Sequence, residues 1–221
     1  GRLSLTPGDD TVTNTGRITG DVYLGNGNNS LDSRSGFIGG NVNGGSGIDT
    51  ILLGAGNATI SPGAGADTID GGAGFDVVSY GSSSVGVAVN LLNGTASRGD
   101  AAGDRLSNIE GLYGSAYRDV LYGDDGNNTI NGVLGADNLA GYGGDDTIIM
   151  YGGIYGGGTG KTAISGGTGN DLIQLISLAS GTYGFAFNAL TQVNGSSGYD
   201  TLEISDAPVM TFTSLTVRGI D

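Results

Sequence analysis

Aspartate recurs at one position of a short glycine-rich unit. Four nine-residue units follow one another over residues 44–79, and a fifth covers residues 166–174. They fit the pattern Gly-Gly-x-Gly-x-Asp-x-U-x, where U is a large apolar residue. Glycines at the first, second and fourth positions permit positive φ and close backbone approach. Such a turn aims several carbonyl oxygens toward one point, and the sixth-position Asp adds a carboxylate.

Hard oxygen donors in this number favour one class of metal ion. Ca²⁺ takes roughly 6–8 oxygens at about 2.3–2.6 Å, whereas Mg²⁺ prefers a tighter octahedron and keeps its waters. The chain has no His and no Cys, the usual ligands of Zn²⁺. The turns therefore predict sites for several Ca²⁺ ions, with unshielded carboxylates of neighbouring turns repelling one another when the metal is removed.

Composition narrows the class of protein further. The chain has 221 residues, of which 47 are Gly, and a net charge of −14. Of its 22 acidic residues only Glu110 and Glu203 are Glu, which favours short carboxylates in turns. The charge argues against nucleic acid and anionic membranes as partners, and no apolar run approaches the roughly 20 residues that span a bilayer. No signal peptide opens the chain, which we interpret as a segment of something larger.

The spacing of the apolar residues predicts the strands that position these turns. Fourteen successive U slots hold a large apolar residue, and a strand's two-residue alternation points each of them inward. They are Val12, Val22, Leu31, Val42, Ile51, Ile60, Ile69, Val78, Leu121, Ile130, Leu139, Ile148, Ile164 and Ile173. Two nonapeptides make one rung of strand, turn, strand and turn, so equivalent turns stack at intervals of about 18 residues. The predicted fold is all-β, a right-handed parallel β-roll or β-helix.

Breaks in the period divide the chain into four parts. Residues 1–79 form a first β-roll block, and residues 80–111 form a spacer with extra strands and a polar loop. Residues 112–174 form a second block, and residues 175–221 form a less regular, truncated C-terminal β extension. No helix is expected in any of them.

The units GGSGIDTIL, GGAGFDVVS and GGTGNDLIQ resemble the repeats of RTX (haemolysin-type) calcium-binding proteins. The stretch from VGVAVNLLNG to DVLYGDDGNN also resembles the spacer between repeat blocks of that family, and residues 5–43 are similar to the looser coils of bacterial surface adhesins. The resemblance implies Ca²⁺ held between equivalent turns of a parallel β-roll. It also implies export from bacteria by type I secretion and an extracellular location.

Carried onto this chain, the resemblance gives a set of candidate ligands. The best pairs join Asp49 with Asp67, Asp119 with Asp137, and Asn128 with Asp146. The whole set comprises Asp10, Asn29, Gly44, Gly45, Gly47, Asp49, Gly63, Gly65, Asp67, Gly72, Gly74, Asp76, Asp119, Asn128, Asp137, Asp146, Gly167, Gly169, Asp171 and Asp200.

Departures from the pattern predict uneven occupancy. Ala58 replaces the Asp that would pair with Asp76, and Thr162 stands where an Asp would join Asp171, so both sites are expected to be weak or absent. Asp200 lies in an isolated unit. The spacer carboxylates are assigned to a solvated loop in preference to a metal site; these are Asp100, Asp104 and Glu110.

These features predict a structural, calcium-binding role in an exported bacterial protein, without catalysis. The carboxylates occupy the metal position of the repeat, and the nearest basic residues are scattered. Two alternatives remain open: an adhesin or surface-layer segment that binds a partner or glycan, and an accessory module of a secreted polysaccharide-active enzyme. Six tyrosines of the second block could form an aromatic glycan face or simply occupy outward strand positions; they are Tyr113, Tyr117, Tyr122, Tyr142, Tyr151 and Tyr155.

Overall fold

The computed structural model describes residues 1–152, 162–177, 185–186, 190–205, 210–211 and 216–220. The chain forms two compact units, one of residues 1–83 with 87–111 and the other of residues 84–86 with 112–221. Within the described residues the secondary structure is β-strand with one short 3₁₀ helix, η1 (Gly99–Ala101), which confirms the predicted all-β class. None of the helices in these ranges is long and apolar enough to cross a membrane.

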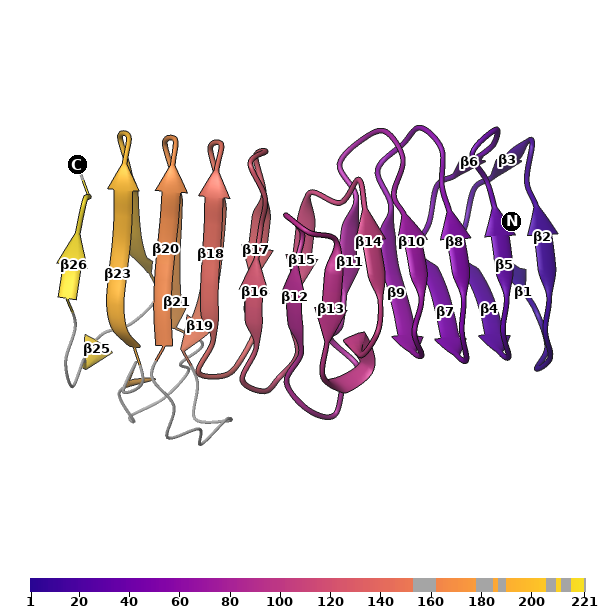
Figure 1. Cartoon of the computed structure of the whole chain (residues 1–221), viewed down its shortest axis with the longest axis horizontal. Helices are drawn as coiled ribbons and strands as arrows, with labels where there is room; N and C mark the ends of the chain where they lie inside the picture. The colour runs from indigo at the N-terminus through magenta and orange to yellow at the C-terminus, as the bar shows by residue number, and fades with distance from the viewer. Residues whose placement is uncertain (153–161, 178–184, 187–189, 206–209, 212–215, 221) are drawn as a thin grey trace. The chain divides into compact units, whose positions relative to one another are not determined.

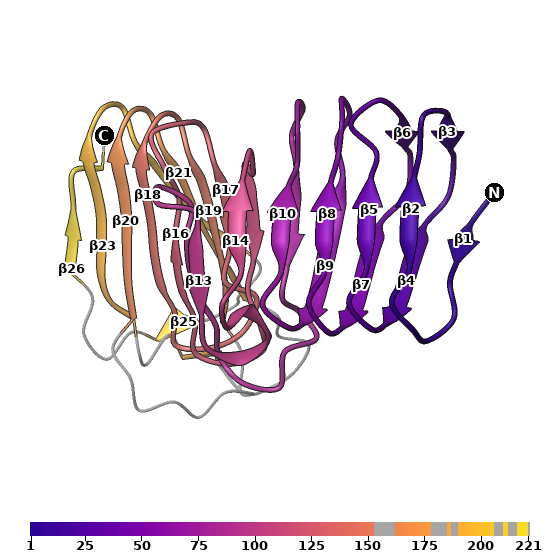
Figure 2. The ribbon, with the colours of Figure 1, turned by 45° about the vertical axis from the view of Figure 1, so that its right-hand side comes forward.

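The first unit contains two sheets of short strands in separate layers (Figures 1 and 2). One sheet runs in the order β1 (Leu3–Ser4), β4 (Val22–Asn26), β7 (Val42–Ser46), β9 (Thr59–Ala64) and β11 (Val77–Ser79). The other begins with β2 (Thr11–Thr13), β5 (Ser30–Asp32), β8 (Thr50–Leu52) and β10 (Thr68–Asp70). The chain visits the two sheets alternately, so each pair of strands forms one rung. A small parallel pair, β3 (Arg17–Ile18) and β6 (Phe37–Ile38), lies between rungs in the sequence.

The predicted spacer adds strands to the second sheet of this unit. β14 (Arg105–Ser107) pairs in parallel with β10, with Ile69 opposite Leu106. The antiparallel pair β12 (Ala88–Asn90) and β13 (Thr95–Ser97) follows, with β13 beside β14. β14 thus occupies the place that the next rung would take in this sheet. The rung pattern therefore resumes within the segment that was predicted to interrupt it.

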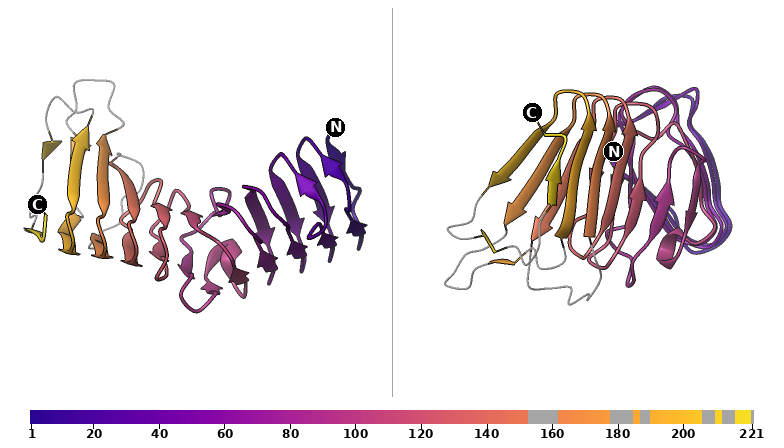
Figure 3. Two further views of the ribbon diagram at one scale, coloured as in Figure 1. Left: turned by 90° about the horizontal axis from the view of Figure 1, so that it is seen from above. Right: turned by 60° about the vertical axis from the view of Figure 1, so that its left-hand side comes forward.

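The second unit repeats the arrangement (Figure 3), and its later strands, such as β20 and β23, are longer. One sheet runs through β15 (Gly111–Tyr113), β17 (Thr129–Asn131), β19 (Thr147–Gly152), β21 (Leu172–Ser177) and β24 (Thr201–Ser205). The other runs through β16 (Val120–Tyr122), β18 (Asn138–Gly143), β20 (Thr162–Thr168), β23 (Leu190–Ser197) and β26 (Thr216–Arg218). β22 (Phe185–Ala186) and β25 (Met210–Thr211) form a separate parallel pair. Much of the predicted C-terminal extension lies outside the described residues.

The strand register follows the predicted repeat. Ile51 of β8 is opposite Ile69 of β10, and Ile130 of β17 is opposite Ile148 of β19. Insertions lengthen the interval without changing the alignment, since Ile148 is opposite Ile173. Strands of successive rungs are therefore parallel and in phase, the arrangement that defines a parallel β-roll.

The U residues form the interior of both units. Thirteen of the fourteen are exposed by no more than 1%, and Val12 near the start of the chain is half-buried. Stacking places each U residue against its equivalents in the neighbouring rungs, so a narrow apolar core runs along the coil. The sequence prediction of inward-pointing U residues is confirmed.

Candidate metal centre

A column of Asp and Asn side chains runs along one turn edge of the first unit, connected by hydrogen bonds from one rung to the next. The Asp10 N–H donates to Asn29 Oδ1 over 3.0 Å, and the Asn29 N–H donates to Asp49 Oδ1 over 2.8 Å. The Asp49 N–H donates to Asp67 Oδ1, and the Asp67 N–H to Asp104 Oδ1, each over 2.8 Å. Each side chain therefore accepts from the backbone of the preceding rung.

The opposite edge of this unit has a shorter column. The Ala58 N–H donates to Asp76 Oδ1 over 2.7 Å, and the Asp76 N–H donates to Glu110 Oε2 over 2.8 Å. Ala58 lacks a carboxylate, as the sequence shows, but Glu110 supplies one on the other side of Asp76. The acidic neighbour of Asp76 thus comes from the segment predicted as a spacer.

The second unit contains one short and one long column. In the short column the Asp119 N–H donates to Asp137 Oδ1 over 2.9 Å. The long column contains Asn128, Asp146, Asp171 and Asp200, joined by N–H to Oδ1 distances of 2.8, 3.0 and 2.9 Å. Aspartates that are 25 and 29 residues apart are thereby aligned as closely as those at the regular spacing.

Two predictions about which residues are neighbours in the long column were wrong. Thr162 opens β20 and pairs with Leu190, so it is not the neighbour of Asp171. Asp171 instead lies between Asp146 and Asp200 in the column. Asp200, expected to be isolated, is the next member of the same column.

Most column aspartates bury one oxygen that has no hydrogen-bond partner. Eight Oδ2 atoms are of this kind among the described residues; they belong to Asp10, Asp49, Asp67, Asp76, Asp137, Asp146, Asp171 and Asp200. In all of these except Asp10 the Oδ1 atom accepts the backbone hydrogen bond given above. A buried acceptor without a donor destabilises a fold. A repeated row of such oxygens therefore indicates a ligand that would lie beside them.

In most units a glycine at the first position makes room for this carboxylate; Asp67, with Pro62 five residues before it, is an exception. A Cβ on Gly44 would lie 2.7 Å from Asp49 Oδ2. The same relation, in which Oδ2 packs against the glycine five residues earlier, recurs at Gly71, Gly132, Gly141, Gly166 and Gly195. The aspartate side chain thus folds back over its own turn and packs against the first residue of the unit. A glycine five residues before the aspartate leaves space for it.

The second and fourth glycines bring backbone carbonyls into stacked rows. A Cβ on Gly65 would overlap the carbonyl oxygen of Gly47, and φ at Gly63 is +91°, where a side chain is disfavoured. The glycines with positive φ that face the carbonyl of the preceding equivalent turn include Gly27, Gly45, Gly47, Gly63, Gly65, Gly72, Gly74, Gly135, Gly167, Gly169 and Gly198. Within the described ranges no three Asp, Glu, His or Cys side chains converge on one point. A cation here would therefore take much of its coordination from these carbonyls, a donor set that fits Ca²⁺.

Burial raises the pKa of the column carboxyls. Desolvation is the largest cause, and it raises the pKa of Asp67 to about 7, that of Asp137 to about 8 and that of Asp146 to about 7. The charges of neighbouring column carboxylates add to the upward shift in all three. A divalent cation beside these oxygens would stabilise the ionised form and lower the pKa.

Asp104 differs from the other column members because a side chain satisfies its second oxygen. The Tyr80 hydroxyl, on a side chain only 1% exposed, donates to Asp104 Oδ2 over 2.8 Å. Asp104 itself is 2% exposed, so the assignment to a solvated loop was wrong for this residue. Burial raises its pKa to about 6, and the hydrogen bonds from the Asp67 N–H and Tyr80 oppose that shift. At this end of the column a neutral hydroxyl therefore donates to the second carboxylate oxygen.

We expect Tyr80→Phe to destabilise the protein by about 1–3 kcal/mol, because it leaves a buried carboxylate oxygen without its donor. Urea unfolding in the presence of Ca²⁺ measures this difference. Tyr113→Phe is the matched control, since Tyr113 is 38% exposed and should tolerate the loss of its hydroxyl. Equal midpoints for both variants would contradict this role of the Tyr80 hydroxyl.

Asp119 is held within its own turn. Its Oδ2 accepts the Ser115 N–H over 2.7 Å, and its Oδ1 accepts the Ser115 hydroxyl over 2.8 Å. The structure thus places Asp119 beside Asp137, as the sequence predicted, but it engages both oxygens of Asp119 with Ser115. Of this pair, Asp137 has the unpartnered oxygen.

A second, more exposed ladder was missed by the sequence analysis. At the fifth position of the unit, Asn57 Oδ1 accepts the Phe75 N–H over 3.0 Å, and Asn127 Oδ1 accepts the Asp145 N–H over 2.8 Å. The fifth-position side chains that accept in this way are Asp9, Asn28, Asn57, Asn127, Asp145 and Asn170. They accept from the following rung, whereas the sixth-position column accepts from the preceding one. The recurrence of Asn or Asp at the fifth position of the unit could have predicted this ladder from the sequence.

Comparison with known proteins agrees with this geometry. Residues 43–78, 112–139 and 134–153 match the family model of the RTX calcium-binding nonapeptide repeat. No curated protein matches the chain. The stacked rungs form a parallel β-roll, and the matched segments are similar to RTX calcium-binding repeats. The match indicates a calcium-binding repeat region over these segments.

Proposed function

We propose that Ca²⁺ ions are held along the turn edges of both units and stabilise the stack of rungs. The observation that supports this proposal is the row of buried Oδ2 atoms that have no partner within the described residues. Ca²⁺ supplies a compact divalent charge that neighbouring rungs share, which converts carboxylate repulsion into a link between rungs.

In the first unit the proposed ligands are the carboxylates of Asp49 and Asp67 with the carbonyls of their glycine turns; the glycines are Gly45, Gly47, Gly63 and Gly65. In the second unit they are the carboxylates of Asp146, Asp171 and Asp200, with carbonyls from turns that include Gly167 and Gly169. Asp10 extends the first column, Asp76 and Asp137 belong to the two shorter columns, and Asn29 and Asn128 contribute neutral oxygens.

The proposed role is structural, in a protein exported from a bacterium. Metal-free columns bury unpaired carboxylates at a cost of several kcal/mol per ion, so folding is coupled to Ca²⁺ and is favoured outside the cell, where that ion is abundant. The column carboxylates contact stacked backbone, and Asp49, Asp67 and Asp76 are each 0% exposed. This burial supports metal binding over acid–base catalysis.

We expect Asp171→Asn to weaken Ca²⁺ binding at its site at least tenfold, a change of about 1.4 kcal/mol. Asparagine keeps an oxygen for the Asp146 N–H but removes the negative charge. Asp145→Asn is the matched control: Asp145 lies in the adjacent exposed ladder, where it accepts the backbone N–H and the side-chain amide of Asn170. Calorimetric titration with Ca²⁺ measures both variants. Equal loss in the two would indicate a general charge effect and contradict the site.

A further inference from the structure

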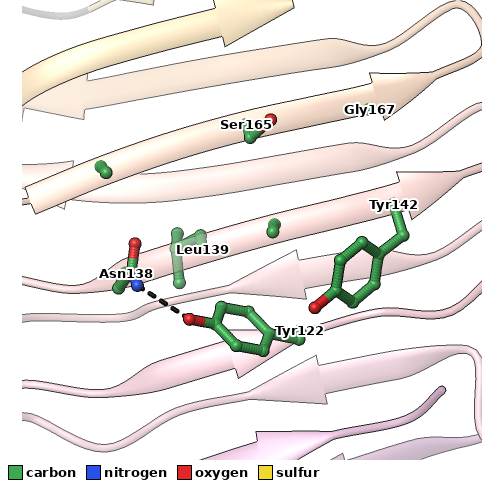
Figure 4. Close-up of a pocket in the computed structure, with 8 residues that line it drawn as sticks. Tyr122, Asn138, Leu139, Tyr142, Ser165 and Gly167 are labelled. Carbon is green, nitrogen blue, oxygen red and sulfur yellow. Dashed lines mark hydrogen bonds between the residues drawn. The ribbon is translucent and has the colours of Figure 1, made fainter. Parts of the chain in front are cut away.

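The outward face of the second unit has a hollow of about 370 Å³ across strands β16, β18 and β20 (Figure 4). Its lining consists of Tyr122, Asn138, Leu139, Ala140, Tyr142, Ala163, Ser165 and Gly167. Ligand pockets range over about 300–1,000 Å³, so this hollow admits a small unit and not a folded segment. It lies mainly on strand faces, and two of its lining residues, Tyr142 and Gly167, also belong to the stacked turns.

Strand register explains why the surface is hollow here. Tyr122 is opposite Ala140, and Ala140 is opposite Ser165, so one bulky side chain is followed by two small ones. Asn138 is opposite Ala163 in the same way. Ala140, Ala163 and Ser165 are half-buried and too small to fill the space beside the tyrosine. The small residues therefore form the floor of the hollow.

Two tyrosines form an angled wall beside this floor. The ring centroids of Tyr122 and Tyr142 are 5.8 Å apart, and the ring planes meet at 62°. The Asn138 amide donates to the Tyr122 hydroxyl over 3.0 Å, which fixes that oxygen and leaves its proton free to point toward a ligand (Figure 4). Tyr142 remains 38% exposed. Of the six tyrosines that the sequence singled out, Tyr122 and Tyr142 line this hollow, and Tyr155 lies outside the described residues.

Tyr142 occupies its place at a conformational cost. It stands at the second position of its unit with φ of +81°, close to the +91° of Gly63 and +87° of Gly72 at the same position. A bulky L-residue in this region costs on the order of 1–3 kcal/mol. Val133 and Ser196 share the conformation at φ of +60° and +78°, so the turn imposes it. At this turn the chain carries an aromatic ring where glycine would be more stable.

We propose that this hollow binds one neutral hexopyranose unit of a glycan. The angled rings offer flat apolar surface to the C–H face of a sugar, and the Tyr122 hydroxyl, Asn138 amide and Ser165 hydroxyl surround it with polar groups. None of the lining side chains is charged, and the protein carries a net charge of −14. An uncharged sugar therefore fits, whereas a uronate would be repelled.

The test uses the full chain in Ca²⁺ with maltotetraose, cellotetraose and mannotetraose as neutral probes, and tetragalacturonate as the charged probe. Saturation-transfer NMR detects contact with the sugar protons, and calorimetry gives the Kd. We expect at least one neutral probe to bind with a Kd on the order of 1 mM, the strength of a small site, and tetragalacturonate not to compete. The absence of binding by all three neutral probes, or tighter binding of the uronate, overturns the proposal.

Tyr142→Gly separates binding from folding. Glycine relieves the backbone strain at this position, so the variant should melt at the same or a higher temperature, yet its affinity for the neutral probe should fall at least about tenfold. Tyr122→Ala should weaken the affinity for the neutral probe by a similar factor. Tyr113→Ala is the matched control, because Tyr113 has the same 38% exposure on β15, outside the hollow. Unchanged affinity in the Tyr142 and Tyr122 variants, or equal loss in the control, would contradict the site.

Discussion

We expect Ile69→Asp to abolish folding of the first unit. Ile69 is 1% exposed and is opposite Ile51 on one side and Leu106 on the other. The substitution removes a buried aliphatic side chain and places a charge where the neighbours are apolar. Losing the side chain alone costs about 2–5 kcal/mol, and the unpaired charge adds to this. The sum is of the order of the whole stability of a domain.

Ile48→Asp provides the control for this prediction. Ile48 is 58% exposed in the adjacent turn, so the same change of residue type should alter the unfolding midpoint only slightly. Far-UV circular dichroism and urea unfolding in Ca²⁺ compare the two variants. A cooperative transition for Ile69→Asp near that of the parent protein would show that this side chain is not in the core.

The second large effect is that Ca²⁺ abolishes a fall in stability between pH 4 and 8. In chelator, the folded protein holds protons on carboxyls whose pKa is raised to about 7 at Asp67, about 8 at Asp137 and about 7 at Asp146. The unfolded chain releases the same protons near pH 4. Between these values the folded state binds more protons, so the free energy of unfolding falls as the pH rises from about 4 to 8.

Ca²⁺ removes this loss because it takes the place of the protons. The stabilisation by Ca²⁺ should be small near pH 4 and grow steadily toward pH 8. Each carboxyl contributes about 1.4 kcal/mol per unit of its pKa shift, so the summed effect should decide whether the protein is folded at neutral pH. Urea unfolding from pH 4 to 8, with chelator and with excess Ca²⁺, measures it. Parallel pH profiles in the two conditions would contradict metal binding at these carboxyls.

Much of the fold could be predicted because the period is local. The nine-residue phase determines that residues such as Ile51, Ile60 and Ile69 face inward, and the 18-residue rung determines which of them become neighbours. Both follow from strand alternation and from stacking, which require no knowledge of distant segments. The position of Asp49 beside Asp67 followed in the same way.

The partners that lie outside the period could not be predicted. Asp104 joins the column next to Asp67 although 37 residues separate them in the chain, and Glu110 joins Asp76 across 34 residues. Both contacts depend on the β12–β13 hairpin, which lies between these residues in the sequence. The conformation of this hairpin cannot be predicted from the repeat. Asp171 was paired with the wrong residue for a related reason, since the insertion before β20 hid its true spacing from Asp146.

The most direct measurement is a crystal structure of the protein grown in Ca²⁺, with anomalous scattering recorded at a wavelength where Ca²⁺ contributes. Peaks are expected at the turn edges beside the Oδ2 atoms of Asp49, Asp67, Asp146 and Asp171, with oxygen distances of about 2.3–2.6 Å. Well-ordered turns without such peaks, in crystals that hold ample Ca²⁺, would contradict the account.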